Sequence, residues 1–212
     1  FKIDRNQLRR LLPILTGEGI NQDILEEGLN NLREFLEEQG YPEAEVKISE
    51  RTDDSGIRAF HYVIVPNNKF TVAYVRFKGN SVLTSQEMLA SVQIQPATFF
   101  QRTVYSVPRL DDDVDALRAL YVSRGYLGAK VIPLIEPLKD GKKLGITYLC
   151  EEGRLSRTRS LNIRGNAALA EKDLKARIKL APGEPYSPSL AERDRLALLS
   201  AYNDLGYLQA QV

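Results

Sequence analysis

The residue types that most often carry chemistry are scarce and scattered in this sequence. Its single histidine, His61, lies in a run of alternating aromatic and aliphatic residues, and no cluster of serine, cysteine or aspartate accompanies it. A hydrolytic triad or a histidine-rich metal site needs several such groups at one place. The single cysteine, Cys150, excludes an intrachain disulfide and is predicted to be a small buried hydrophobic side chain. We therefore expect no enzyme activity, no cofactor and no metal site.

Two clusters of charge also have ordinary structural interpretations. Asp111–Asp113 stand at a predicted helix start, where carboxylates interact favourably with the helix dipole. Arg154, Arg157 and Arg159 precede a predicted strand and are expected to form a solvated face, although contact with an acidic partner stays open. With 29 basic and 28 acidic residues the net charge is +1. Nucleic-acid-binding proteins usually show a basic surplus, so we expect no nucleic-acid ligand, and no motif points to a small-molecule substrate.

The composition indicates a folded domain or domains. Apolar residues make up 43% of the chain, which is enough for a core. No run of 18 apolar residues exists, so no helix is expected to span a bilayer. The first residues lack a charged segment followed by an apolar one, so we expect either an intracellular protein or a mature fragment. Scarcity of cysteine suits an oxidising compartment equally well.

The stretch Tyr74–Asn80 recurs as Leu161–Asn166. In both copies apolar and polar residues alternate, and both end at Gly-Asn, which predicts a half-buried strand that leaves the sheet at the glycine. A helix signal follows each copy. After the first copy, Thr84 and Glu87 have the spacing of a capping box.

A second motif, Gly-Tyr-x-x-Ala-x-Val, begins at Gly40, Gly125 and Gly206. We expect each glycine to end a helix and each tyrosine to cover the corner between helix and sheet. The alanine and valine, two residues apart on a strand, should point into the core. Three copies in register indicate a tandem array.

The elements follow the order strand, helix, helix, strand, strand, which is an α+β pattern. Only residues 68–153 contain the complete order; residues 1–67 lack its first strand and residues 154–212 its last strand. The helices are predicted at residues 6–14, 21–39, 84–95, 110–124, 169–180 and 189–205, and the strands at 41–49, 57–65, 70–78, 129–136, 144–150 and 155–164, with a further strand entered at 206–212.

This order resembles the POTRA (polypeptide-transport-associated) domain, which occurs in tandem in the Omp85 group of outer-membrane assembly proteins. The resemblance is carried by Phe77–Asn80 and Ile163–Asn166, by Gly125-Tyr126 with its two counterparts, and by the acidic-glycine junction Glu151–Gly153. It implies a three-stranded mixed sheet with two helices on one face in each repeat. Two segments depart from the pattern: Val65–Asn68 replaces the acidic-glycine junction, and Tyr105–Pro108 forms an unusual helix-to-helix connection.

The resemblance also implies a function. It predicts a non-catalytic scaffold on the periplasmic side of the bacterial outer membrane that binds unfolded outer-membrane proteins or accessory assembly proteins, with a C-terminal membrane β-barrel outside this chain. Two alternatives stay open: the POTRA region of a two-partner secretion transporter, and a membrane-anchored adaptor. A KH-like RNA-binding module is a remote alternative, because none of the interhelical loops at residues 16–19, 95–98 and 182–185 is Gly-x-x-Gly.

Binding is expected at an edge strand, where an extended client can pair with free backbone groups by β-augmentation. The family sheet places the second strand of each repeat at an edge. The main candidate edge is therefore Ala44, Glu45, Val46, Lys47, Ile48 and Ser49, and the weaker candidate is Ala129, Lys130, Val131 and Ile132. Pro133 and Pro137 follow the weaker edge, and proline cannot donate to a ladder. The plain alternative is that both edges are merely solvated.

Overall fold

The computed structural model describes residues 3–13, 20–52, 54, 56, 58–98 and 103–212, and its chain divides into two compact units. The first unit comprises Phe1–Arg76, Val92–Val114 and Pro133–Tyr148, and the second Phe77–Ser91, Asp115–Ile132 and Leu149–Val212. The division passes through strands and a long helix of the middle predicted repeat. Parts of three predicted segments lie outside the described residues: residue 14 of the first helix, residues 16–19 of the first interhelical loop, and residue 57 of a strand.

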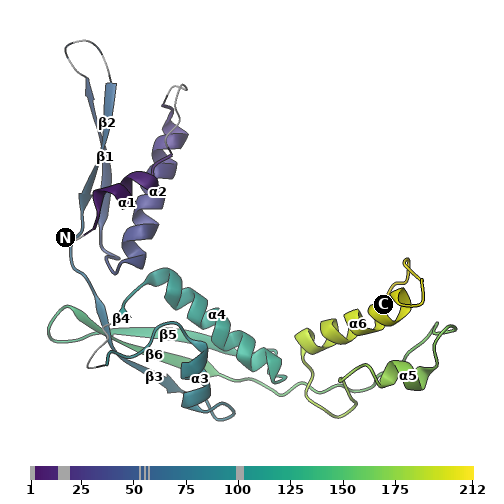
Figure 1. The fold of residues 1–212 in the computed structure, drawn as a ribbon. Helices are drawn as coiled ribbons and strands as arrows, with labels where there is room; N and C mark the ends of the chain where they lie inside the picture. Colours follow the sequence, from purple (N-terminus) through teal and green to yellow (C-terminus); the bar gives the residue numbers. More distant parts are fainter. Residues whose placement is uncertain (1–2, 14–19, 53, 55, 57, 99–102) are drawn as a thin grey trace. The chain divides into compact units, whose positions relative to one another are not determined.

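In the first unit a helix packs on a two-stranded hairpin (Figure 1). The elements are α1 (Arg5–Arg10), α2 (Gln22–Glu38), β1 (Glu45–Thr52) and β2 (Arg58–Val65). The Asn21 side chain caps α2 by accepting from the Ile24 N–H, and Gly40 leaves the helix at φ +90°, as predicted. The apolar stripe of α2 supplies Leu32 and Leu36, which are buried against Val46 of β1. These side chains form the core between α2 and the hairpin.

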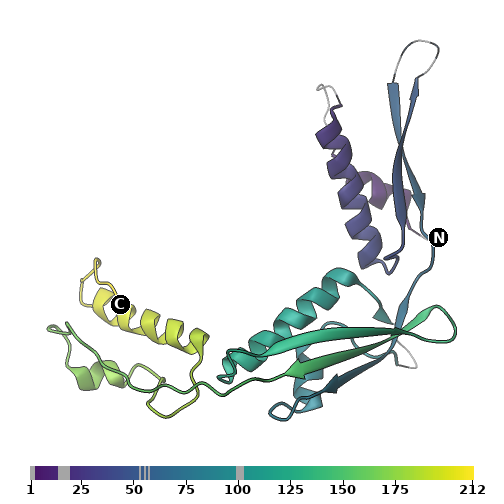
Figure 2. The same cartoon turned by 180° about the vertical axis from the view of Figure 1, so that it is seen from behind.

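The middle repeat contains a mixed sheet in the order β4-β3-β6-β5. Its strands are β3 (Thr71–Lys78), β4 (Thr103–Val104), β5 (Lys130–Pro137) and β6 (Lys143–Glu151). The Thr71 N–H donates to the Lys142 carbonyl, and Gly79 lies against the Cys150 carbonyl, so β3 and β6 run parallel. The last strand is central and the second is at an edge, as expected, while the two-residue β4 is an addition. Helix α4 (Val107–Ser123) lies along this sheet (Figure 2).

The predicted capping box is formed at α3 (Ser85–Ser91). The Glu87 carboxylate accepts from the Thr84 N–H at 2.9 Å and from its hydroxyl at 2.8 Å, and the Glu87 N–H donates back to that hydroxyl. Arg124 adds an ion pair at 2.9 Å. These bonds to the ionised form, that from the Thr84 backbone first, lower the pKa of Glu87 from 4.5 to about 2.

The interpretation of Asp111–Asp113 as dipole-stabilising residues at a helix start was wrong. Helix α4 begins at Val107, one turn earlier, and Asp113 is only 1% exposed. Its carboxylate accepts from the Gln93 N–H at 2.5 Å, the Ile94 N–H at 3.0 Å and the Tyr148 hydroxyl at 3.0 Å. Burial raises the pKa of Asp113, against the lowering effect of these bonds. Asp113 therefore ties the loop after α3 and the central strand to α4.

The third predicted repeat has less regular structure than expected. The strand predicted at 155–164 is absent apart from one bridge between Arg157 and Pro185, and residues 206–212 form no strand. The helix predicted at 169–180 is shortened to α5 (Glu171–Lys175), whereas α6 (Pro188–Asn203) forms as predicted. Within the described residues nothing corresponds to the central strand β6. Residues 155–164 therefore lack the neighbour whose backbone would complete a ladder.

We expect Glu87→Gln to destabilise the protein at neutral pH and progressively less in acid. Because folding lowers the pKa of Glu87 from 4.5 to about 2, its stabilisation is present above 4.5 and is lost as the pH falls through the lowered value. Urea midpoints of both proteins between pH 2.5 and 7 should converge toward the acid end. Glu34→Gln, a change on the exposed side of α2, is the control. A difference between Glu87→Gln and wild type that does not vary with pH would contradict this account.

Candidate peptide-binding edge strands

The main candidate edge lies on β1. Among the described strands β1 pairs only with β2, antiparallel, with Glu45 opposite Val65 and Thr52 opposite Arg58. Ala44 precedes the strand, and its N–H donates to the Tyr41 carbonyl, so Ala44 does not belong to the open edge. In an antiparallel pair, alternate residues turn their backbone groups away from the partner. No proline stands between Glu45 and Thr52, so every outward-facing residue of β1 has a backbone N–H.

The side chains of β1 separate into a core face and a charged face. Val46 is 2% exposed and packs in the core, whereas Glu45 and Lys47 form an exposed ion pair at 2.7 Å. The hydrogen bond from Lys47 lowers the pKa of Glu45. Ile48 and Ser49 are half-buried. Charged side chains on an edge discourage uncontrolled association without removing backbone donors.

The weaker candidate edge lies on β5, whose only neighbour among the described strands is β6. The Leu138 N–H donates to the Lys143 carbonyl at 2.8 Å, so Leu138 faces β6. By alternation Glu136, Leu134 and Ile132 also face β6, while the backbone of residues 131, 133, 135 and 137 faces the open side. Two of those four outward residues are Pro133 and Pro137. The open side of β5 therefore has half the donors of an unbroken strand.

The four predicted residues of this edge have different surroundings. Ala129 precedes β5, is buried, and donates its N–H to the Tyr126 carbonyl. Lys130 is exposed, Val131 is buried, and Ile132 is 44% exposed.

One feature of the edges was not predicted from the sequence. Leu134 and Ile135 are exposed apolar side chains on β5, at 42% and 40%. Leu134 stands on the same face of the strand as Ile132, and Ile135 stands on the opposite face. The run Ile132–Ile135 was a usable signal for this feature. Strand β2 also has only one neighbour among the described strands, whereas its counterpart β6 is paired on both sides. This open side of β2 agrees with the expectation that residues 1–67 lack the first strand of the repeat.

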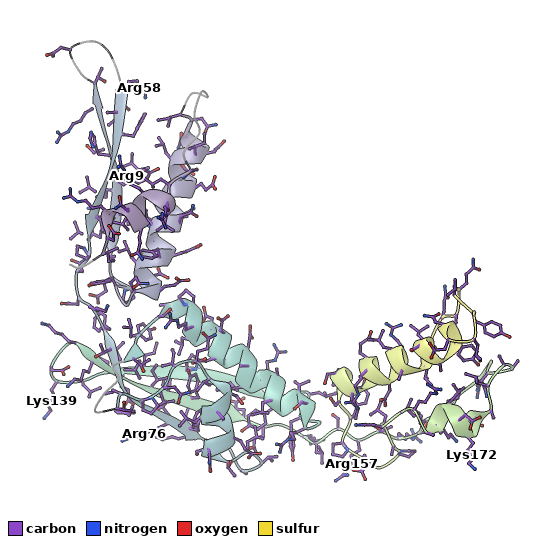
Figure 3. All side chains as sticks on the ribbon, in the orientation of Figure 1. Arg9, Arg58, Arg76, Lys139, Arg157 and Lys172 are labelled. Carbon is purple, nitrogen blue, oxygen red and sulfur yellow. The ribbon has the colours of Figure 1, made fainter. Side chains whose placement is uncertain are left out.

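Tyr74 of β3 contacts both β6 and β5 across one face of the sheet. Its ring lies over Gly145 of β6, where an added methyl would overlap ring atoms, and its hydroxyl donates to Glu136 of β5 at 2.8 Å. The Arg76 guanidinium stacks on the ring at 4.2 Å, and Figure 3 labels Arg76 and, at the tip of the β5–β6 hairpin, Lys139. The bond to Glu136 raises the pKa of Tyr74. Tyr74 thereby joins β3, β6 and β5 across the glycine.

The remaining candidates for chemistry, His61 and Cys150, are ordinary strand residues. His61 is exposed on β2, and Cys150 is buried in β6. Among residues with described placement, no group of three histidine, cysteine, aspartate or glutamate side chains is arranged to hold a metal ion. No helix in the described ranges is both long and apolar enough to cross a membrane.

Comparison with known proteins gives three successive family matches. The model described as "POTRA: Surface antigen variable number repeat" matches residues 1–67, 70–153 and 156–212. A Treponema pallidum (strain Nichols) protein named for outer membrane protein assembly is 26% identical over 196 residues, which are 90% of this chain and 23% of that protein. The outer membrane protein assembly factor BamA of Buchnera aphidicola subsp. Acyrthosiphon pisum (strain APS) is 20% identical over 211 residues, 95% of this chain and 33% of that protein. The chain thus spans a third or less of these relatives.

Two solved structures share the fold. The crystal structure of Haemophilus influenzae BamA POTRA3-5 aligns with a TM-score of 0.55 at 19% identity, covering 99% of this chain and 83% of that chain. BamA from Haemophilus ducreyi lacking POTRA domains 1–3 aligns with a TM-score of 0.55 at 17% identity, covering 71% of this chain and 27% of that chain.

Replacing Gly145 with alanine should destabilise the middle sheet by about 1–3 kcal/mol, because the new methyl displaces the Tyr74 ring. Gly128→Ala, at a position with open space, should change the free energy of unfolding by less than about 0.5 kcal/mol. In a Tyr74→Ala background the cost of Gly145→Ala should largely disappear. Urea denaturation of the four variants measures these values. Additive effects of the two changes would show that the ring and the glycine are not coupled.

Proposed function

Since this chain belongs to the POTRA (surface antigen variable number repeat) family over nearly its whole length, we propose that it is the polypeptide-binding, non-catalytic scaffold of an outer-membrane protein assembly factor. The observation that carries the proposal is the three family matches in succession, and the two curated relatives are named for that process. The proposed repeats are residues 1–67, 68–153 and 154–212, and the proposed location is the periplasmic side of the outer membrane.

The proposed partners are unfolded outer-membrane proteins and accessory assembly proteins. Such clients share the ability to form strands but no common sequence, and main-chain pairing at an edge recognises that shared property. About four net hydrogen bonds at roughly 1 kcal/mol each correspond to a Kd of about 1 mM. Binding of that strength permits a client to be held briefly and passed on. No observation on this chain favours the secretion-transporter, adaptor or RNA-binding alternative.

The proposed client edge is Glu45–Ser49 of β1. It is supported by the absence of proline along β1 and by the two prolines on the open side of β5. The charged pair Glu45 and Lys47 stands on the exposed face, so a client strand can pair with β1 without displacing core side chains.

Titration with a peptide from a strand of an outer-membrane protein tests this choice of edge. In ¹⁵N NMR spectra the largest amide shifts should fall on Glu45–Ser49. Equal or larger shifts on residues 130–135 would reverse the preference, and shifts confined to β2 would move the site to the other side of the hairpin. Absence of any saturable shift at millimolar peptide would leave both edges as solvated strands and would overturn the binding proposal.

Replacing both Pro133 and Pro137 with threonine should create a second receptive edge. The change restores two outward N–H donors and leaves the β6-facing positions untouched, so amide shifts on β5 should grow to match those on β1. The same NMR titration, run in parallel on both proteins, measures the gain. Threonine in place of Leu134, which faces β6, is the matched control and should produce no gain. If shifts on β5 stay small in the double variant, missing donors are not what blunts this edge.

A further inference from the structure

The three Gly-Tyr corners end their helices in the same local geometry. The backbone turns at φ +90° at Gly40, at φ +92° at Gly125 and at φ +87° at Gly206. In each copy the N–H of the tyrosine that follows donates to a helix carbonyl five residues earlier, at 2.9–3.0 Å. Their surroundings differ, because Gly40 and Gly125 are buried whereas Gly206 is exposed. The corner by itself therefore does not bury the first two glycines.

A main-chain hydrogen bond from the following repeat reaches each of the two buried glycines. The Phe70 N–H donates to the Gly40 carbonyl at 2.9 Å, and the Ser156 N–H donates to the Gly125 carbonyl at 2.8 Å. Phe70 and Ser156 are the residues at which the second and third family matches begin. The same backbone contact thus joins a helix end to the start of the next repeat at both places. The first contact lies within the first compact unit and the second within the second unit.

The segment between the two helices of the following repeat adds a second contact. The Tyr105 N–H donates to the Phe70 carbonyl at 3.1 Å, and the Tyr186 N–H donates to the Ser156 carbonyl at 2.9 Å. Each tyrosine directly follows a residue that pairs with the beginning of the repeat, in β4 or in the isolated bridge. The short strand β4 therefore has a counterpart in the third repeat, and both stand beside the glycine of the preceding repeat.

Side chains of these segments take the space in which a residue other than glycine would place its Cβ. At Gly40 an added Cβ would overlap the Val104 side chain. At Gly125 it would lie 3.0 Å from the Cβ of Pro185, which is tighter than an ordinary van der Waals contact. At Gly206 no described atom lies within 4 Å of that position. The two buried corners therefore need glycine to leave room for the following repeat.

Positive φ alone does not explain the choice of glycine. Asn67 adopts φ +51°, and asparagine also occurs at the left-handed residue that ends a helix. An asparagine at Gly40 would still place a Cβ against Val104. The absence of a side chain, more than the backbone conformation, is what the contact with the following repeat requires.

We propose that the glycine at the end of the second helix is a docking site for the following repeat of the same chain. The start of that repeat bonds to the glycine carbonyl, and the segment between its helices fills the space beside the glycine. Motion of one repeat against the next therefore requires this contact to open. The site is intramolecular and separate from the client edge on β1, so it does not depend on peptide binding.

Alanine at the three glycines separates docking from backbone strain. All three variants carry left-handed strain, but only Gly40→Ala and Gly125→Ala place a methyl group in an occupied site. In hydrogen exchange of the 212-residue chain, the protection of the Phe70 and Tyr105 amides, relative to amides inside α2, should fall at least about tenfold in Gly40→Ala because overpacking opens the contact. Gly206→Ala should leave that ratio within about twofold of wild type, because distant sites act independently.

Two further variants probe the same contact. Gly125→Ala should lower the protection of the Ser156 and Tyr186 amides in the same way. Val104→Ala removes the side-chain atoms that the new methyl meets, so adding it to the Gly40→Ala chain should restore most of the lost protection. In ¹⁵N relaxation the rotational correlation time of the first repeat should be shorter in Gly40→Ala than in wild type and unchanged in Gly206→Ala.

Four results would overturn the proposal: equal losses of protection in the three alanine variants, no recovery on adding Val104→Ala, an unchanged correlation time in Gly40→Ala, and no nuclear Overhauser contact between the Val104 methyl groups and the Gly40 Hα atoms in the unchanged chain. The first would show that left-handed strain alone accounts for the loss. The last measurement needs no variant, so it stays decisive if an alanine variant unfolds.

Discussion

The central strand is the element on which the rest of a repeat depends. In the middle repeat β6 pairs with β3 on one side and β5 on the other, and its alternate side chains close the core under α4. Where no described segment takes this place, in the third repeat, residues 155–164 form one isolated bridge and the first helix shrinks to five residues. A strand has no intrinsic stability without a neighbour, because its backbone donors and acceptors are satisfied only across a ladder. Helix α6 forms regardless, because the backbone hydrogen bonds of a helix are made within the helix itself.

The middle repeat fixes its central strand with a buried polar contact as well as with apolar packing. Asp113 is costly to bury, yet it receives two amides and the Tyr148 hydroxyl, so the ion is almost fully hydrogen-bonded. Apolar contacts tolerate small sliding of a strand, whereas a hydroxyl that must reach one carboxylate does not. The register of β6 relative to α4 is therefore set by this contact. In the first repeat Gly28 and Tyr62 achieve a similar tie through a helix carbonyl.

Local signals in the sequence predicted much of the fold. The capping box at Thr84 and the helix ends at Gly40 and Gly125 depend on neighbours within a few residues, and the structure confirms them. The predicted strand at 155–164 failed because its pattern was correct but its partner was not among the described strands. The Asp113 interpretation failed because α4 begins one turn earlier, through residues expected to be an irregular connection. Contacts such as Tyr74 over Gly145 join residues far apart in sequence, and only strand order brings them together.

Along each edge strand, residues alternate between facing the neighbouring strand and facing the open side. On β5 the residues that face β6 carry the ladder, while those that face outward make no bond within the described sheet. Proline at outward positions 133 and 137 therefore costs the ladder nothing and removes sites for an external strand. On β1 the outward positions keep their N–H groups. Under the proposed edge binding, substitutions at the outward positions would alter pairing with an external strand, while folding depends on the inward positions.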